Sequence, residues 1–318
     1  MKILITDKTA NEAIQMLKDA DHEVTFDEMD AEKLLKTISE YDALLVRGRT
    51  KVITDVVNAG AKGNLKVIGR AGIGVDNVDI ETAAKNGIKV VNAPTGSTIS
   101  VAELAIGHML SLSRHLTRAD STMKKGNWAK KQLKGTELFG KTLGLIGTGN
   151  IGRLTASYAK ALGMKIVGFD PFISEADMKK DGVEKIEKLE DLMGVSDFIS
   201  LHVPHITQTH HIVNEKMLSL MKPSAFLINC ARGGVVDEKA LYDALKNGKI
   251  AGAGFDVFEE EPPKDSPLMS LDNIVLTPHL GANTKEGQIR AGTICAEQII
   301  KVLNGENPDY WVNKKFFK

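Results

Sequence analysis

The sequence is poor in three features that would each point to a particular class of protein. It has two cysteines, Cys230 and Cys295, which are too few for a disulfide framework and lack the C-x-x-C spacing of zinc and redox sites. Its 41 basic and 41 acidic side chains cancel, and no polybasic run stands out. The apolar run at the N-terminus ends at Ile5, too short for a signal peptide or a spanning helix. We therefore expect a soluble, cytoplasmic protein that binds neither nucleic acid nor membrane.

What the sequence does contain is a repeated alternation of short β-branched runs with amphipathic stretches of helical period. This alternation is typical of parallel sheets wrapped by helices, and 318 residues favour two domains. The first series of runs predicts five strands of a flavodoxin-like sheet, at residues 2–5, 23–26, 43–46, 66–68 and 89–91. The second predicts six strands of a larger sheet, at residues 142–146, 165–169, 197–201, 225–228, 251–255 and 273–276. The predicted fold class is α/β, with two doubly wound parallel-sheet domains.

Two helical patterns are expected to connect these domains. The first covers residues 100–122 and has little to break it except Gly107. The second covers about 285–303, with Gly305 as a C-cap, and is expected to return the chain to the first domain. The first domain would then be discontinuous, formed by residues 1–99 and 285–318, with residues 100–284 inserted in it. Both crossings would act as hinges beside a cleft.

A glycine motif follows the first strand of the second series. Residues 147–152 read Gly-Thr-Gly-Asn-Ile-Gly, and a helical pattern comes next, as in dinucleotide-binding turns. The first glycine permits a tight turn, the second lets the backbone approach a pyrophosphate, and the third lets helix and strand pack closely. Asp170 closes the following strand, where it would bind ribose hydroxyls and repel a 2′-phosphate. The combination predicts NAD rather than NADP; the alternative is a glycine turn in an ordinary α/β sheet.

Reactive side chains follow three later strands of the same series: Arg232, Glu261 and His279. Oxidation of a secondary alcohol beside a carboxylate requires a base, a cation for the carboxylate and a hydride acceptor. His279 would be the base, Glu261 would orient its imidazole and raise its pKa, and Arg232 would engage both carboxylate oxygens. Taken singly, these residues could be surface ions or a helix cap. Together, at strand ends beside a nucleotide motif, they predict a dehydrogenase acting at C2 of a 2-hydroxy acid.

Around these residues the chain resembles the D-isomer-specific 2-hydroxyacid dehydrogenases. The resemblance lies in GTGNIG at 147–152, NCARGGVVDE at 229–238, GFDVFEEEPP at 254–263 and LTPHLGA at 276–282. It implies that Arg232, Glu261 and His279 are catalytic, that residues 1–99 and 285–318 form a substrate-binding lid and that residues 100–284 form a Rossmann NAD domain. The implied cofactor-binding residues are Gly147, Gly149, Asn150, Ile151, Gly152, Asp170, Pro171, Val203, Pro204, Cys230, Ala231, Arg232, Asp256, His279, Gly281 and Ala282. Cys230 can equally be a small buried apolar residue.

Three further segments suggest the substrate. GRAGIGVDNVD at 69–79, NAPTGSTISVAEL at 92–104 and GTELFGKTLGLIG at 135–147 resemble the members that oxidise D-3-phosphoglycerate more than those that act on lactate or formate. Such a substrate needs cations for its phosphate.

Arg47 and Arg49 follow an apolar strand and alternate, so we expect both to point to one side and to bind the phosphate. Their alternative is a pair of solvated strand-end charges. The resemblance assigns the substrate carboxylate to backbone N–H groups of Gly72, Ile73 and Gly74. Ile73 stands where many relatives carry a hydroxyl residue, so a side-chain bond to the cofactor is lost there.

The resemblance has implications for regulation and assembly as well. Longer relatives continue into a C-terminal domain that senses serine, whereas this chain ends at Lys318, so feedback by that route is not expected. Trp128, in KKGNWAKK, matches the family segment at a dimer contact and predicts a homodimer. A partly buried surface aromatic is the other interpretation of Trp128.

Other functions have weaker support in the sequence. His202, His205, His210 and His211 lie within ten residues, but no acidic or thiol partner completes a ligand set, so no metal is expected. Glyoxylate, hydroxypyruvate or lactate as substrate would leave every catalytic residue in place. Transcriptional corepressors share the fold and motifs, so an NADH-sensing scaffold is the alternative of another class. The expected mechanism is ordered: NAD binds, the lid closes and excludes water, and His279 takes the hydroxyl proton.

Overall fold

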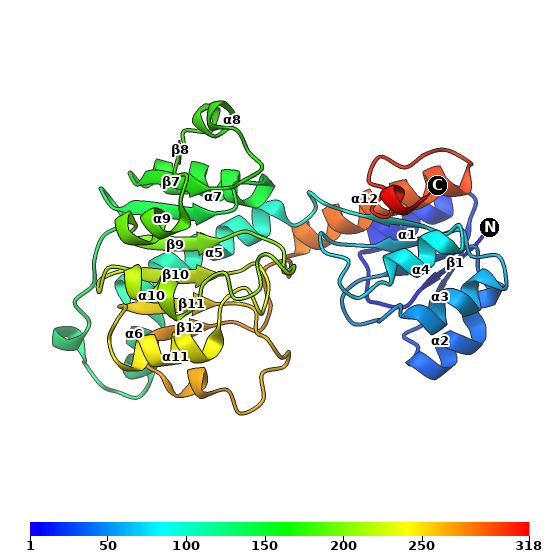
Figure 1. Cartoon of the computed structure of the whole chain (residues 1–318). Helices are drawn as coiled ribbons and strands as arrows, with labels where there is room; N and C mark the ends of the chain where they lie inside the picture. The colour runs from blue at the N-terminus through cyan, green and yellow to red at the C-terminus, as the bar shows by residue number, and fades with distance from the viewer. Residues whose placement is uncertain (318) are drawn as a thin grey trace. The chain divides into compact units, whose positions relative to one another are not determined.

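The computed structural model describes residues 1–317 and divides into two compact units. Unit 1 consists of Met1–Thr98 and Ala282–Lys318, and unit 2 is Ile99–Gly281. Each unit is a parallel sheet with helices on both faces (Figure 1). Among the described residues no helix is both long enough and apolar enough to cross a membrane.

The sheet of unit 1 has five parallel strands in the order β2-β1-β3-β4-β5. They are β1 (Lys2–Ile5), β2 (Glu23–Phe26), β3 (Ala43–Val46), β4 (Val67–Arg70) and β5 (Lys89–Asn92). This order is flavodoxin-like, and it reverses between β1 and β3, where such sheets bind ligands beyond the strand ends. The register pairs Ile5 with Leu45, so the chain leaves both strands side by side.

Helices cover both faces of this sheet. On one face α2 (Ala31–Thr37), α3 (Thr54–Ala61) and α4 (Ile80–Lys85) bury Leu34, Val57 and Ala83. On the other face α1 (Asn11–Asp19) and α12 (Lys285–Leu303) bury Leu17, Cys295 and Ile299. The predicted helix over 285–303 is confirmed, and Gly305 follows it with a left-handed φ of 85°. Two short 3-10 turns are η1 (Ile38–Glu40) and η4 (Lys314–Phe316).

The sheet of unit 2 has seven parallel strands in the order β12-β11-β10-β9-β6-β7-β8. They are β6 (Thr142–Ile146), β7 (Lys165–Phe169), β8 (Glu184–Lys185), β9 (Phe198–Leu201), β10 (Phe226–Asn229), β11 (Gly252–Phe255) and β12 (Ile274–Leu276). Six were predicted; β8 has two residues, too few to show a periodicity. The order is that of a dinucleotide-binding sheet extended by one strand, and it reverses between β6 and β9.

The helices of unit 2 also form two layers. On one face lie α9 (Leu189–Val195), α10 (Glu215–Leu220) and α11 (Glu238–Lys246). On the other lie α5 (Thr98–Arg114), α7 (Asn150–Ala161) and α8 (Glu175–Lys180). Two 3-10 turns, η2 (Lys130–Gln132) and η3 (Pro267–Ser270), complete the unit.

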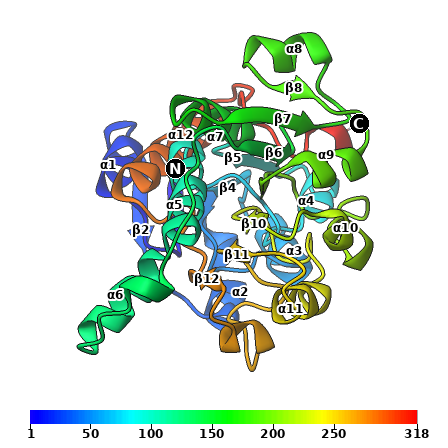
Figure 2. The same cartoon turned by 90° about the vertical axis from the view of Figure 1, so that its left-hand side faces the viewer.

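The prediction of one continuous helix over 100–122 is wrong. The structure has α5 and a separate α6 (Leu116–Lys124), because His115 between them adopts a left-handed backbone with φ 51°. Gly107, the expected weak point, stays inside α5. Figure 2 shows α6 turned away from the axis of α5. The spacing of apolar residues does not reveal a single left-handed residue, so the helical pattern continues past His115 although the helix ends there.

Candidate functional site

The glycine motif forms the turn between β6 and α7, and the structure shows a different role for glycine at each of its three positions. Gly147 has φ 91°, and a Cβ there would lie 2.7 Å from the His202 carbonyl oxygen. A Cβ on Gly152 would lie 2.3 Å from the Gly147 carbonyl oxygen. Around a Cβ on Gly149 nothing lies within 4 Å. The first and third positions therefore exclude side chains for internal reasons, whereas the second faces open space that a diphosphate can approach.

Asp170 is held at the end of β7 by the backbone around it. Its Oδ2 accepts from the Thr148 N–H at 2.9 Å, and its Oδ1 accepts from the Phe172 N–H at 3.0 Å. This fixes a carboxylate beside the glycine turn. Together with the N-terminus of the 12-residue helix α7, whose first N–H groups favour anions, the turn and the carboxylate fit an adenine dinucleotide.

The other predicted cofactor residues lie on loops that follow the strands next to this turn. Val203 and Pro204 follow β9, on the other side of the point where the strand order reverses. Ala231 follows β10, and its N–H donates to the Asn229 side-chain oxygen at 3.0 Å. Burial raises the pKa of the Cys230 thiol well above its usual range, as does the charge of Asp256, so Cys230 is a neutral, buried side chain.

Asp256 is fully buried and uses its carboxylate within the chain. Its Oδ1 accepts from the Thr277 hydroxyl at 2.6 Å and from the Leu280 N–H at 2.7 Å. Its Oδ2 accepts from the Gly281 N–H at 2.8 Å. Asp256 therefore shapes the loop 277–281, which carries His279.

His279 and Glu261 form a close pair. Nδ1 of the imidazole lies 2.7 Å from Oε2 of the carboxylate, and the other carboxylate oxygen accepts from the Phe258 N–H at 3.1 Å. The hydrogen bond with Glu261 raises the pKa of His279 above its ordinary value, against the opposing effect of burial. Burial would raise the pKa of Glu261, but the hydrogen bond and charge of His279 lower it. The pair therefore favours a charged imidazole opposite a charged carboxylate.

Arg232 belongs to the same group. Its Nη1 donates to the Ala231 carbonyl at 2.7 Å. Its charge contributes to lowering the pKa of Glu261 and opposes, as a minor effect, the raised pKa of His279. The three side chains follow β10, β11 and β12, which are neighbours in the sheet. The structure thus brings together the three residues that the sequence singled out. Asn229, which the sequence did not single out, shapes this loop by donating to the Arg232 carbonyl at 3.0 Å.

The histidine cluster makes local contacts. His205 Nε2 lies 3.0 Å from His210 Nδ1, and His211 Nε2 lies 2.9 Å from Glu259 Oε1. His202 lies apart, with Nε2 3.0 Å from the Ser200 hydroxyl. Across residues 1–317, no group of three or more histidine, cysteine or acidic side chains is arranged to hold a metal ion.

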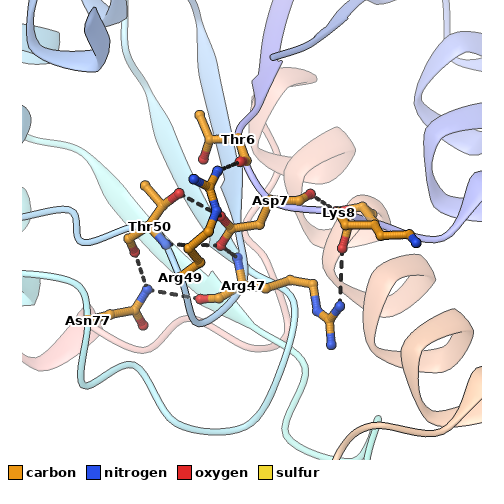
Figure 3. Close-up of polar contacts among 8 residues, drawn as sticks. Thr6, Asp7, Lys8, Arg47, Arg49, Thr50 and Asn77 are labelled. Atoms are coloured by element: carbon orange, nitrogen blue, oxygen red, sulfur yellow. Dashed lines mark hydrogen bonds and ion pairs between the residues drawn. The ribbon is translucent and has the colours of Figure 1, made fainter. Parts of the chain in front are cut away.

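In unit 1, the loops after β1 and β3 meet around one buried carboxylate, as Figure 3 shows. Asp7 is 3% exposed and accepts from the Thr50 hydroxyl at 2.6 Å and from the Arg47 N–H at 2.6 Å. Asn77 closes the loop by donating to the Arg47 and Thr50 carbonyls at 2.9 and 2.6 Å. Asp7 was not predicted from the sequence, because its partners Arg47 and Thr50 lie 40 and 43 residues further on, in the loop after β3.

The two arginines of this loop have different surroundings. Arg49 Nε lies 3.3 Å from Asp7 Oδ1, and its Nη2 donates to the Thr6 carbonyl. Arg47 Nη1 instead donates to the Lys8 carbonyl at 3.1 Å, and its guanidinium points away from that of Arg49 in Figure 3. The expectation that both point to one side of a strand is wrong, because β3 ends at Val46. Burial lowers the pKa of Arg47, which the charge of Asp7 opposes.

Gly72, Ile73 and Gly74 form the loop after β4. A Cβ on Gly72 would lie 1.6 Å from Arg70 Nη1, so glycine at this position leaves room for that guanidinium. The Ile73 carbonyl accepts from the Asn92 side chain at 2.6 Å. Arg70 is a third arginine at this edge of the sheet, and sequence reasoning missed it although it lies within the GRAGIG segment.

These features define a class of protein: a unit with a dinucleotide-binding turn and an imidazole–carboxylate–guanidinium group, encoded within a second parallel-sheet unit. The NAD binding domain of the D-isomer specific 2-hydroxyacid dehydrogenases matches residues 106–281, and the chain belongs to that family.

Two curated relatives show how the likeness extends over the whole chain. D-3-phosphoglycerate dehydrogenase of Methanocaldococcus jannaschii is 51% identical over 313 residues, which are 98% of this chain and 59% of the relative. Hydroxypyruvate reductase of Thermotoga maritima is 48% identical over 306 residues, 95% of this chain and 98% of the relative. The chain therefore spans less than two thirds of the first relative and nearly all of the second.

Among solved structures, D-lactate dehydrogenase from Aquifex aeolicus, in complex with NAD and lactic acid, is 31% identical. Its TM-score is 0.84, and the match covers 96% of each chain.

Proposed function

We propose that the protein oxidises D-3-phosphoglycerate to 3-phosphohydroxypyruvate with NAD, the reaction of D-3-phosphoglycerate dehydrogenase. This reaction starts serine biosynthesis from a glycolytic intermediate. The chemistry of the proposal rests on the 2.7 Å pair of His279 and Glu261 beside Arg232, at three adjacent strand ends of the NAD-binding unit. Its choice of substrate is supported by the 51% identity to D-3-phosphoglycerate dehydrogenase of Methanocaldococcus jannaschii. Such a group can take a proton from a hydroxyl while a cation holds the neighbouring carboxylate.

His279 is the acid/base in this proposal. Its Nδ1 faces Glu261, so Nε2 is the atom that takes the proton of the C2 hydroxyl. Glu261 stabilises the imidazolium that results, and Arg232 holds the substrate carboxylate through two of its N–H groups. NAD, when bound, accepts the hydride that leaves C2. In the reductive direction the protonated imidazole returns its proton to the carbonyl oxygen.

The glycine turn and Asp170 would hold the cofactor. The open space at Gly149 and the first N–H groups of α7 suit the diphosphate. Asp170 would accept hydrogen bonds from the adenosine ribose hydroxyls, and its charge disfavours a 2′-phosphate.

Unit 1 would bind the phosphate of the substrate. Arg47 and Arg70 present guanidinium groups at its carboxyl edge, and Arg47 follows one of the two strands between which the strand order reverses. Arg47 donates a hydrogen bond to a neutral carbonyl and is partly desolvated, so a bound anion would stabilise the charge of its guanidinium. The backbone N–H groups around Gly72 to Gly74 would take the carboxylate.

A second candidate is reduction of hydroxypyruvate, because the chain matches the Thermotoga maritima reductase over 98% of that protein's length. It would use the same acid/base and differ at the phosphate. Oxidation of NADH should be measured with 3-phosphohydroxypyruvate, hydroxypyruvate, glyoxylate and pyruvate. The proposal expects the highest kcat/KM with the phosphorylated acid. A preference for hydroxypyruvate selects the second candidate, and NADH binding without turnover of any acid selects the scaffold.

We further propose that the active form is a homodimer. Trp128 is 75% exposed, and α6 just before it buries none of its residues. Leu116 and Met123 of α6 are each 53% exposed, so three large apolar side chains of this segment face solvent, as is typical of a subunit contact. Light scattering coupled to size exclusion should give twice the mass of the chain, and Trp128→Glu should shift it toward the monomer. A monomeric wild type would contradict this part.

A further inference from the structure

We propose that His108, on helix α5, is a positioning residue for His279 that acts through Thr277 and Asp256. The proposal rests on the proposed function in one respect, that His279 is the acid/base. All four residues belong to unit 2.

A continuous chain of hydrogen bonds connects His108 to the loop of His279. His108 Nε2 lies 3.1 Å from the Thr277 hydroxyl oxygen, and that hydroxyl donates to Asp256 Oδ1 at 2.6 Å. The same carboxylate accepts the N–H groups of Leu280 and Gly281 at 2.7 and 2.8 Å. The His279 N–H donates to the backbone carbonyl of Asp256 at 2.8 Å. The bonds therefore grip the loop on both sides of His279.

The direction of these bonds follows from the chemistry of the groups. Asp256 as a carboxylate only accepts, so the single hydroxyl proton of Thr277 goes to it. The Thr277 oxygen can then only accept from His108, which must carry its proton on Nε2. Burial lowers the pKa of His108, although the charge of Asp256 raises it, so the imidazole is neutral near pH 7. The Nδ1 atom of His108 is buried, with no hydrogen-bond partner among the described residues.

Close packing supports the same arrangement. His108 is 2% exposed, and a Cβ on Gly254 of β11 would lie 2.9 Å from both its Cβ and its Nδ1. At the other end of the chain of bonds, a Cβ on Gly281 would lie 3.2 Å from Asp256 Oδ2 and 3.3 Å from Val101, also on α5. The loop 277–281 therefore packs against α5 at two places, near Val101 and at His108, and His108 makes the polar contact.

His279 needs such support because its backbone is left-handed, with φ 51°. A residue with a side chain keeps this conformation when the surrounding structure holds it there. The charged groups whose effects reach His279 are Glu261, Asp256 and Arg232, and Asp256 also faces His108 and Cys230. Loosening the loop would therefore weaken the contact of His279 with Glu261 and with it the cause of the raised pKa.

The test compares His108→Met, which keeps the volume but removes the donor, with His108→Gln, which keeps an N–H in reach of Thr277. Ser113→Ala is the matched control. Ser113 is a buried polar residue of α5, 2% exposed, and its hydroxyl donates at 3.2 Å to the Leu110 carbonyl of the same helix. Two quantities are measured on the full chain: the pKa of His279 by ¹⁵N-histidine NMR, and kcat with the best 2-keto acid.

We expect His108→Met to lower the pKa of His279 toward its ordinary value and to reduce kcat about tenfold, with NADH affinity changed less than about twofold. His108→Gln should restore most of both, and Ser113→Ala should change neither. Thr277→Val should match His108→Met, and the double variant should lose no more than Thr277→Val alone.

An unchanged pKa of His279 in His108→Met overturns the proposal, as does an equal shift in Ser113→Ala. The NMR titration needs no turnover. If the protein reduces none of the acids, the proposed function is refuted, but the NMR titration of His279 still tests the role of His108.

Discussion

The phosphate assignment can be tested by replacing Arg47 with glutamine, which removes the charge and keeps much of the stem. In the structure Arg47 donates to the Lys8 carbonyl, whereas Arg49 faces the buried carboxylate of Asp7 at 3.3 Å. Arg49 is therefore ion-paired within the protein, whereas the guanidinium of Arg47 contacts a neutral carbonyl and can pair with an anion. We expect Arg47→Gln to discriminate between phosphorylated and unphosphorylated substrates and Arg49→Gln to do so much less.

The size of the effect follows from the bonds that are lost. A hydrogen bond between charged partners contributes about 1.5–3 kcal/mol, so Arg47→Gln should lower kcat/KM for 3-phosphohydroxypyruvate by roughly 10- to 150-fold. For hydroxypyruvate, which has no phosphate, the change should stay within about threefold, the spread of context effects at a site that the substrate does not contact. In Arg49→Gln, Asp7 keeps Thr50 and the Arg47 N–H, so we expect a loss of about 1–2 kcal/mol in unfolding free energy.

The assay follows the loss of NADH absorbance with both keto acids for the wild type, Arg47→Gln and Arg49→Gln, and urea unfolding supplies the stabilities. The diagnostic quantity is the ratio of the two kcat/KM values. If Arg47→Gln lowers both values equally, or neither, Arg47 does not bind the phosphate. If Arg49→Gln changes the ratio as much as Arg47→Gln does, the distinction drawn from Asp7 is wrong.

Three further outcomes are expected. His279→Asn should abolish turnover while fluorescence shows unchanged NADH binding; near-normal turnover would rule out its acid/base role. Because Glu261 raises the pKa of His279, the rate of oxidation should increase as pH rises through a midpoint above the pKa of an ordinary histidine, and the rate of reduction should decline over the same range. Glu261→Gln should move both midpoints to lower pH; midpoints that do not move would contradict the pairing of Glu261 with His279. Gly152→Ala should remove NADH binding, because its Cβ would lie 2.3 Å from a carbonyl oxygen of the turn, whereas normal affinity measured by titration would show that the turn can relax.

The sequence predicted most of the fold because each strand and helix has its own apolar pattern. The long strands of both sheets lie within one or two residues of their predicted ranges, and α12 lies at 285–303 as expected. The errors are of a different kind. The strand β8 pairs two residues at a sheet edge, and His115 breaks a helix by one backbone angle. Neither feature alters the apolar periodicity from which the elements were inferred.

The two candidate sites differ in how far the sequence could describe them, and topology explains the difference. Arg232, Glu261 and His279 follow β10, β11 and β12, strands that are consecutive in the chain and adjacent in the sheet. Because the order of these strands in the sequence is also their order in the sheet, the sequence alone predicts that the three side chains lie close together.

The site in unit 1 is built from β1 and β3, which are adjacent in the sheet but separated in the chain by β2. Its central carboxylate, Asp7, therefore stayed unnoticed, and Arg47 and Arg49 looked equivalent. The sequence locates arginines at the end of a strand. Which of them lies beside a carboxylate depends on which strands are neighbours in the sheet. The same reasoning applies to His108, whose partner Thr277 lies 169 residues away, so its proposed role rests on the structure alone.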